Sequence, residues 1–127
     1  MNPKKAIIRT GDEGLKKSFS AIGQSMVIHE WTGSGPPYMH VHYQDDEAWH
    51  ILEGALTFKF IDHEMIASKG TTVFVPAGVA HTYFDHNESC RYLMILTPRL
   101  NDLIAELHET KFADHGEVMR KYYSEIL

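Results

Sequence analysis

The stretch HVHYQDDEAWHILEG, residues 40–54, contains two histidines two positions apart and a glutamate five positions after the second. On a β-strand, residues i and i+2 project to the same face, so the imidazoles of His40 and His42 can converge on one ion. Residues 44–46 are turn-forming, so we expect the chain to bend there and Glu47 to open the next strand. Taken alone, a His-x-His pair on a strand more often points into solvent or packs than binds a metal.

A second stretch, GTTVFVPAGVAH at residues 70–81, ends in a further histidine. Pro76 and Gly78 favour a bend that delivers His81 inward. Three imidazoles and one carboxylate form a mixed nitrogen and oxygen donor set. Such a set suits a first-row divalent metal and leaves one or two positions for water, substrate or dioxygen. The single cysteine, Cys90, cannot supply the thiolates of a closed structural zinc site.

Together, the two stretches resemble the two signature motifs of the cupin superfamily, small β-barrels that usually hold a metal. The first reads H-x-H-x4-E-x6-G and the second G-x5-P-x-G-x2-H, so eight defined positions match at fixed spacing. The resemblance implies four metal ligands, namely His40, His42, Glu47 and His81. It also makes Glu47 the ligand expected to act in catalysis. Ser34 stands where the family often has glycine and Asp85 where it often has asparagine, but neither departure removes a ligand.

Short β-type runs separated by turn residues fill the chain up to Pro98, with no helical spacing between them. This pattern is typical of an antiparallel sandwich or barrel. We therefore predict an all-β fold, a cupin-type antiparallel β-barrel (double-stranded β-helix or jelly roll) over residues 1–98. A short C-terminal helical tail over residues 99–127 is expected to pack on the barrel within the same single domain. The expected strands are Lys5–Arg9, Leu15–Ala21, Gln24–Trp31, Tyr38–Tyr43, Ala48–Leu52, Ala55–Ile61, Thr71–Val75, His81–Phe84 and Arg91–Leu96.

The tail is predicted to form two helices. Thr97 can cap the first, with Pro98 at its first position. Its apolar stripe is Leu100, Leu103, Ile104 and Leu107. Asp114 is expected to cap the second, with Glu117 placed as in a capping box. The expected buried face of this second helix is Val118, Met119, Tyr122 and Ile126. We expect the helices to cover an open end or face of the barrel rather than to take part in chemistry.

Six side chains are candidates for lining a substrate pocket, although aromatic residues and methionine are more often plain core. They are Tyr38, Trp49, Tyr83, Met26, His29 and Met94. Parity along the strand that Glu47 opens places Trp49 on the same side as Glu47 and His50 on the other. Four further histidines fall in polar turns or in the tail and are expected at the solvated surface. These are His63, His86, His108 and His115.

The charge balance limits the classes of binding partner, and the cysteine content bears on the cellular compartment. With 12 basic and 17 acidic residues, the formal net charge is −5, which argues against a nucleic-acid or anionic-membrane surface. No apolar run approaches the roughly 20 residues of a membrane span, and the one near the start is too short for a secretory signal. A single cysteine excludes an internal disulfide, which fits a cytoplasmic location.

We therefore expect one divalent transition metal (Fe, Mn, Ni, Zn, Co or Cu) and a small-molecule substrate or ligand. A looser resemblance to quercetinase-like single-barrel proteins, carried by the strand ending near Thr97-Pro98 and the tail, favours a dioxygenase acting on an oxygen-rich, enolic or aromatic molecule. A redox-inert metal would instead polarise a carbonyl for isomerase or lyase chemistry. A binding or sensing protein without turnover is a further alternative. By resemblance to single-barrel cupins, a homodimer is expected.

Overall fold

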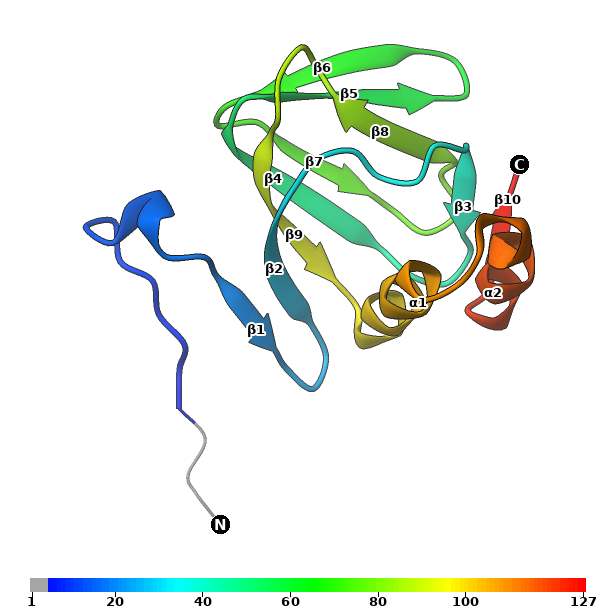
Figure 1. Cartoon of the computed structure of the whole chain (residues 1–127), viewed down its shortest axis with the longest axis horizontal. Coiled ribbons are helices and arrows are strands. Elements are labelled where there is room, and N and C mark those ends of the chain that lie inside the picture. The colour runs from blue at the N-terminus through cyan, green and yellow to red at the C-terminus, as the bar shows by residue number, and fades with distance from the viewer. Residues whose placement is uncertain (1–4) are drawn as a thin grey trace.

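The computed structural model describes residues 5–127 and contains two five-stranded antiparallel sheets that face each other (Figure 1). One sheet has the strand order β1-β2-β9-β4-β7, and the other has the order β10-β3-β8-β5-β6. The strands are β1 (Ser20–Ile22), β2 (Val27–Thr32), β3 (His40–His42), β4 (Glu47–Glu53), β5 (Ala55–Phe60), β6 (Glu64–Ser68), β7 (Thr72–Val75), β8 (His81–Asp85), β9 (Arg91–Leu96) and β10 (Ser124–Ile126).

Strands that are distant in the sequence are neighbours in both sheets, as in β9 beside β4 and β3 beside β8. This antiparallel, double-sheet arrangement is the jelly-roll form of the double-stranded β-helix, so the predicted fold class is confirmed. Within residues 5–127 the ladders form two separate sheets. The barrel is therefore closed by side-chain packing between the sheets and not by a continuous cylinder of hydrogen bonds.

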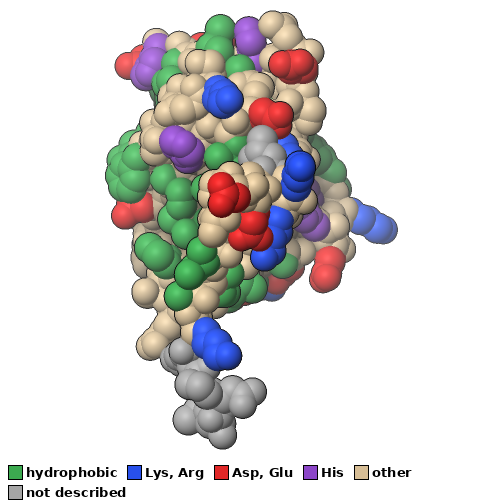
Figure 2. All heavy atoms as spheres, turned by 90° about the vertical axis from the view of Figure 1, so that its left-hand side faces the viewer, with side chains coloured by type: hydrophobic (Ala, Val, Ile, Leu, Met, Phe, Trp, Pro, Cys, Tyr) green, Lys and Arg blue, Asp and Glu red, His purple; other side chains and the backbone are tan. Residues whose placement is uncertain are grey.

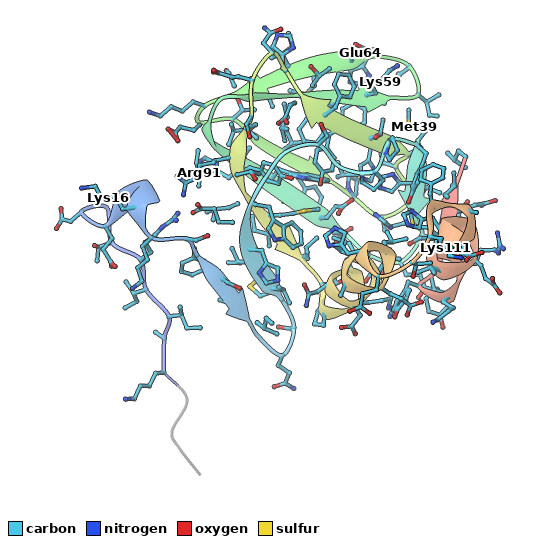
Figure 3. The ribbon with its side chains drawn as sticks, in the orientation of Figure 1. Lys16, Met39, Lys59, Glu64, Arg91 and Lys111 are labelled. Atoms are coloured by element: carbon cyan, nitrogen blue, oxygen red, sulfur yellow. The ribbon has the colours of Figure 1, made fainter. Side chains whose placement is uncertain are left out.

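Alternation along the strands determines which side chains fill the space between the sheets (Figure 3). In β4, Glu47, Trp49 and Ile51 are buried, whereas the residues between them are partly exposed. Trp49 lies opposite Met94 of β9, and Ile51 lies opposite Tyr92. Because successive side chains on a strand point to opposite faces, the register that buries Trp49 also directs Glu47 into the interior.

The tail begins with a helix, α1 (Pro98–His108), whose start agrees with the sequence prediction. Thr97 precedes it in extended conformation, and its side-chain oxygen accepts a hydrogen bond from the Leu100 backbone N–H at 3.1 Å. This bond satisfies one of the donors left free at a helix start. The buried residues of α1 are Leu100, Leu103 and Leu107. These side chains belong to the hydrophobic core, and α1 itself lies at one end of the two sheets (Figure 1).

The rest of the tail differs from the prediction in two respects. A 3-10 helix, η2 (Phe112–Asp114), leads directly into α2 (His115–Lys121), and the Asp114 side chain makes no capping hydrogen bond. The predicted capping box is therefore wrong, because Asp114 belongs to a preceding helical turn instead of an extended segment. The chain then leaves the helix, and Ile126 lies in β10 instead of on a helical face. Since β10 extends a sheet of the barrel, we propose that residues 1–98 and 99–127 fold as one domain. A further 3-10 turn, η1, covers Gly14–Lys16.

Candidate metal centre

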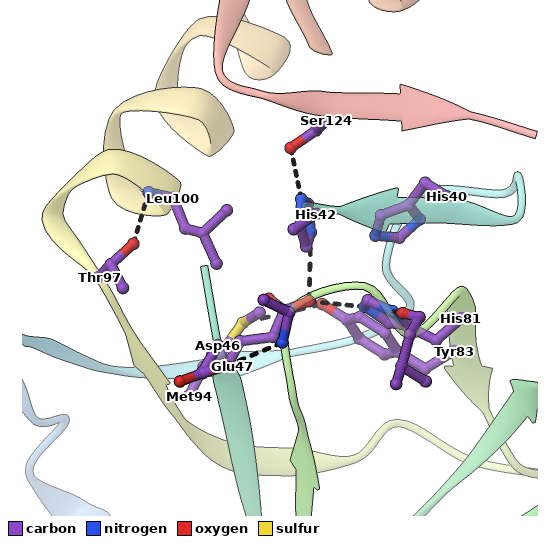
Figure 4. Close-up of polar contacts among 12 residues, drawn as sticks. His40, His42, Asp46, Glu47, His81, Tyr83, Met94, Thr97, Leu100 and Ser124 are labelled. Atoms are coloured by element: carbon purple, nitrogen blue, oxygen red, sulfur yellow. Dashed lines mark hydrogen bonds and ion pairs between the residues drawn. The ribbon is translucent and has the colours of Figure 1, made fainter. Parts of the chain in front are cut away.

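Three strands bring four potential metal ligands together between the sheets (Figure 4). His40 and His42 are the two ends of β3, and His81 opens β8 in the same sheet, where it lies directly opposite His40. Glu47 opens β4 in the facing sheet. One donor atom from each of the four lies within 4.8 Å of all the others. All four residues are buried, and none is more than 6% exposed to solvent.

The Glu47 carboxylate lies at the centre of the polar contacts of this cluster (Figure 4). Its Oε1 atom lies 2.6 Å from Nε2 of His81 and 3.2 Å from Nε2 of His42. The His40 ring packs against both other imidazoles, with ring centroids 4.5 Å from His81 and 4.9 Å from His42. The three imidazoles therefore pack against one another beside the Glu47 carboxylate.

The Nδ1 atoms of the three histidines are each held by a separate hydrogen bond. Nδ1 of His40 lies 3.1 Å from the Tyr38 carbonyl oxygen, and Nδ1 of His81 lies 3.0 Å from the Val79 carbonyl oxygen. A carbonyl only accepts hydrogen bonds, so both Nδ1 atoms carry the proton. Nδ1 of His42 bonds the Ser124 hydroxyl oxygen at 2.7 Å. His42 and His81 thus present Nε2 to Glu47, and the Nδ1 atoms of all three rings are held by second hydrogen bonds of the kind that fix the histidine ligands of metal sites.

Burial and the neighbouring carboxylate set the protonation of the cluster. Burial lowers the pKa of His40 to about 3, and the neighbouring imidazoles act in the same direction. Burial also opposes the charged form of His81, but the hydrogen bond and negative charge of Glu47 outweigh it and raise the pKa of His81. Burial would raise the pKa of Glu47, but its hydrogen bonds to His42 and His81 outweigh this effect and hold the pKa well below its usual range.

The donor set fits a first-row divalent metal. An ion placed about 2.0–2.2 Å from each of four donors needs donor pairs no more than about 4.4 Å apart. The observed limit of 4.8 Å is within a few tenths of an ångström of that requirement. Nitrogen donors with one carboxylate and no thiolate suit Fe, Mn, Co, Ni, Cu or Zn better than Ca or Mg. The four residues that the sequence singled out are therefore brought together in a geometry that could hold such an ion.

Three of the predicted pocket residues, Trp49, Tyr83 and Met94, form a chain of contacts that begins at the cluster. Trp49 packs edge-on against the rings of His81 and Tyr83, with ring centroids 5.7 Å and 5.2 Å apart, respectively. The Tyr83 hydroxyl points to the Met94 sulfur at 3.9 Å. Burial raises the pKa of Tyr83 to about 12, so its phenol is neutral at physiological pH. The indole N–H of Trp49 is buried and has no hydrogen-bond partner among the described residues.

The other predicted pocket residues lie elsewhere or act differently. Tyr38 packs edge-on against His40 at 6.0 Å. His29 lies opposite Met94 on the inner face of its sheet, but Ser20 and Asn101 hold both of its ring nitrogens. Met26 is 54% exposed and lines a different hollow near the N-terminal segment, because it precedes β2 in the turn that follows β1. The structure does not bring Met26 to the cluster.

Two residues of the tail were not expected near the site. His115 was predicted at the solvated surface, but its Nδ1 bonds the Tyr38 hydroxyl at 2.9 Å and its Nε2 lies 3.1 Å from the Leu107 carbonyl oxygen. Ser124, on β10, bonds His42. No spacing in the sequence signals the role of Ser124, because it lies 82 positions after its partner.

A small double-stranded β-helix that carries a buried three-histidine, one-glutamate cluster defines the class of this protein. A family model described as "Cupin domain" matches residues 26–96, which is more than half of the chain. The protein therefore belongs to the cupin family. A search among curated proteins found no match.

Solved structures show the same fold at low sequence identity. A cupin-2 domain protein from Shewanella frigidimarina matches with a TM-score of 0.57 and 22% identity, covering 70% of this chain and 92% of that one. KdgF from a Halomonas species matches with a TM-score of 0.54 and 16% identity, covering 65% and 79%. The polyketide cyclase RemF from Streptomyces resistomycificus matches with a TM-score of 0.53 and 21% identity, covering 59% and 56%. Within the described residues, no helix has the length and apolar character needed to cross a bilayer.

Proposed function

We propose that this cupin binds one divalent transition metal through His40, His42, Glu47 and His81 and uses it to oxidise a small enolic or aromatic molecule with dioxygen. The observation that carries the metal site is the convergence of four buried donor atoms within 4.8 Å, with the three imidazoles oriented by separate hydrogen bonds. Such a site, when loaded with a redox metal, supplies electron transfer to dioxygen and a positive charge that attracts an anionic substrate oxygen.

The phenols around the cluster support oxygenase chemistry over isomerase or lyase chemistry. An isomerase that removes and returns a proton with separate groups needs a second base besides Glu47. The inner tyrosines cannot serve as that base at neutral pH, because burial raises the pKa of Tyr83 to about 12 and that of Tyr92 still further. An oxygenase does not need such a base for its redox steps, because the metal and dioxygen supply that chemistry.

Glu47 has the proposed catalytic role. It is the carboxylate of the cluster, and its low pKa keeps it ionised. An enol that binds through its oxygen must lose a proton to become electron-rich, and a Glu47 carboxylate oxygen can accept that proton. The buried, unpartnered N–H of Trp49 adds a donor for a substrate oxygen next to His81.

We propose that the substrate enters beside Tyr38. A hollow of about 220 Å³ is lined by Tyr38, by Pro36 and by residues of the tail that include Ile104, Leu107 and His115. The Tyr38 ring separates this hollow from His40, against which it packs. Because the ligands themselves are nearly inaccessible, the Tyr38 ring must swing aside to admit a molecule to the cluster.

The experiment is anaerobic loading with each metal, followed by addition of dioxygen and a panel of enols that includes a flavonol. We expect dioxygen uptake with at least one redox metal, and both atoms of ¹⁸O₂ in the product. The His81→Ala variant should show no uptake, and His63→Ala, altered in an exposed turn residue, should match the wild type. Absence of uptake and of product with every metal would contradict the oxygenase proposal. Product without dioxygen consumption would identify an isomerase or lyase, and tight ligand binding without product would identify a binding protein.

We also propose a cytoplasmic homodimer that binds neither nucleic acid nor membranes. Figure 2 shows apolar side chains gathered on the face that carries the N-terminal segment. The exposed large apolar residues of this part of the chain are Ile7, Ile8, Ile22 and Met26. An exposed apolar patch beside an edge strand such as β1 favours association with a second copy. A sedimentation measurement giving a monomer at micromolar concentration would contradict the dimer.

A further inference from the structure

The three histidines of the cluster are oriented in two different ways. His40 and His81 each bond the backbone carbonyl two residues earlier, at 3.1 and 3.0 Å, so their orientation is built into their own strands. Within the described residues, His42 Nδ1 makes no such local bond and instead bonds Ser124, which comes from the far end of the chain. Ser124 is 2% exposed, so water does not readily replace it.

The hydroxyl of Ser124 selects the tautomer of His42. Its one proton is donated to the Tyr122 carbonyl oxygen at 3.1 Å. The hydroxyl oxygen can therefore only accept at its 2.7 Å contact with His42, so Nδ1 of His42 carries a proton. Nε2, the atom that lies 3.2 Å from Glu47 Oε1, is then the nitrogen through which His42 can bind a metal (Figure 4).

Several contacts place Ser124 at this position. β10 pairs antiparallel with β3, with Ser124 opposite His42 and Ile126 opposite His40. Backbone hydrogen bonds flank this ladder, from Tyr43 N–H to the Tyr123 carbonyl at 2.9 Å and from Leu127 N–H to the Met39 carbonyl at 2.9 Å. Tyr123 makes the turn before β10 with φ of 57°, a left-handed conformation that side chains rarely adopt. The Arg99 guanidinium lies over the Tyr123 ring, 4.8 Å from its centroid.

We propose that residues Ser124–Leu127 are part of the metal centre, with Ser124 as a positioning residue, so that metal binding and docking of β10 on β3 are coupled. This inference rests on the proposed binding of a metal by the cluster. A docked β10 holds His42 ready to bind, and a bound metal holds β3 in the geometry that β10 recognises. Because such coupling is reciprocal, it can be measured from either side.

The first test measures metal affinity, by competition with a chelator, in wild type and in Ser124→Ala. Without the hydroxyl, the buried Nδ1–H of His42 loses its acceptor, and the alternative tautomer places a proton on Nε2 where the metal must bind. We expect roughly 10- to 100-fold weaker binding of Zn²⁺ or Co²⁺. A variant lacking residues 124–127 should lose at least as much. The matched control is Thr72→Ala, which removes a hydroxyl bonded at the same 2.7 Å distance to Nδ1 of His50, outside the cluster.

The second test uses the wild-type chain, so it does not depend on a variant folding. Added Zn²⁺ should slow hydrogen exchange at the Leu127 amide but not at the Gly23 amide, which makes an equally short 2.9 Å bond in the β1–β2 turn. If wild type binds no divalent metal, the proposed function falls together with this inference. If wild type binds metal but Ser124→Ala binds equally well, or if Leu127 exchange ignores the metal, only the coupling is overturned.

Discussion

At the scale of single residues, the rings of His40 and His81 are oriented by the chain immediately around them. Each histidine bonds the carbonyl two positions before it, so the strand that carries the ring also fixes its rotation. This local orientation fits the fixed spacing of the two motifs, whose resemblance to the cupin signatures pointed to the residues that converge. The partner of His42 lies 82 positions away and could not be found in the same manner.

Removing a ligand imidazole should abolish metal retention. We expect His40→Ala and His81→Ala to lower metal content per chain at least tenfold, because each removes one of four donors from a buried site. His63→Ala and His86→Ala should retain wild-type content, since these residues contact Asp62 and Thr57 and not the cluster. Metal content after gel filtration, measured by elemental analysis, checks this. Equal losses in both pairs would mean that the wrong imidazoles are assigned.

Metal affinity should fall as the pH falls. Nδ1 of His81 donates to a carbonyl and Nε2 contacts the Glu47 carboxylate, so the metal has to displace a proton from Nε2. Despite burial, Glu47 raises the pKa of His81, and competition by protons therefore begins above the ordinary histidine value of about 6.5. His40 adds no competition there, because burial lowers its pKa to about 3.

We expect the apparent dissociation constant to rise about tenfold per pH unit below the pKa of His81, and to level off above it. Titration calorimetry between pH 5 and 8, in buffers of different ionisation enthalpy, measures both the affinity and the proton released. Constant affinity over this range would argue against imidazole ligation.

At the scale of elements, the strands of the two sheets were easier to predict than the ends of the chain. However, β6 was not predicted, and the predicted strand Lys5–Arg9 is wrong, because residues 5–9 form no strand. The alternation in β4 and β9 is dictated by a two-sided environment, with apolar packing inside and solvent outside, so it is written into the sequence. The helix start at Thr97 and Pro98 was also predictable, because the capping bond and the proline act within the first turn. β10 carries no such signal, because three residues are too few to show a period and its pairing depends on β3.

The turn between β4 and β5 should tolerate no side chain at Gly54. Its φ is +74°, and an added Cβ would lie 2.8 Å from the Ser89 carbonyl oxygen, a backbone atom that cannot easily move. Gly70 is the matched control, since its φ is +89° but no atom lies within 4 Å of an added Cβ. We expect Gly70→Ala to cost about 1–2 kcal/mol through backbone strain alone, and Gly54→Ala to cost at least about 1 kcal/mol more.

Urea denaturation of both glycine variants measures the difference in free energy of unfolding. Equal losses would show that the chain around Ser89 yields to the added methyl group. A larger loss at Gly54 would confirm that β5, whose Phe60 lies opposite His81, is held tightly at its start.

At the scale of the whole molecule, the cluster joins the two sheets. His40, His42 and His81 belong to one sheet and Glu47 to the other, and within the described residues no ladder connects the two sheets. A metal bound to all four residues would add a bridge where packing alone now holds the sheets together. That bridge is lost on unfolding, because the ligands come from distant segments of the chain. Glu47 and His81, for example, are 34 positions apart.

Metal should therefore raise the temperature of global unfolding. A free metal concentration 100 times the dissociation constant stabilises the folded state by about 2.7 kcal/mol, which corresponds to roughly 10 °C for a domain of this size. We expect the melting temperature to fall by that amount when a chelator strips the protein and to recover when metal is restored, as followed by calorimetry. The His81→Ala variant should melt at one temperature with or without metal. A wild-type melting temperature that ignores every added divalent ion would show that the four side chains do not hold a metal between the sheets.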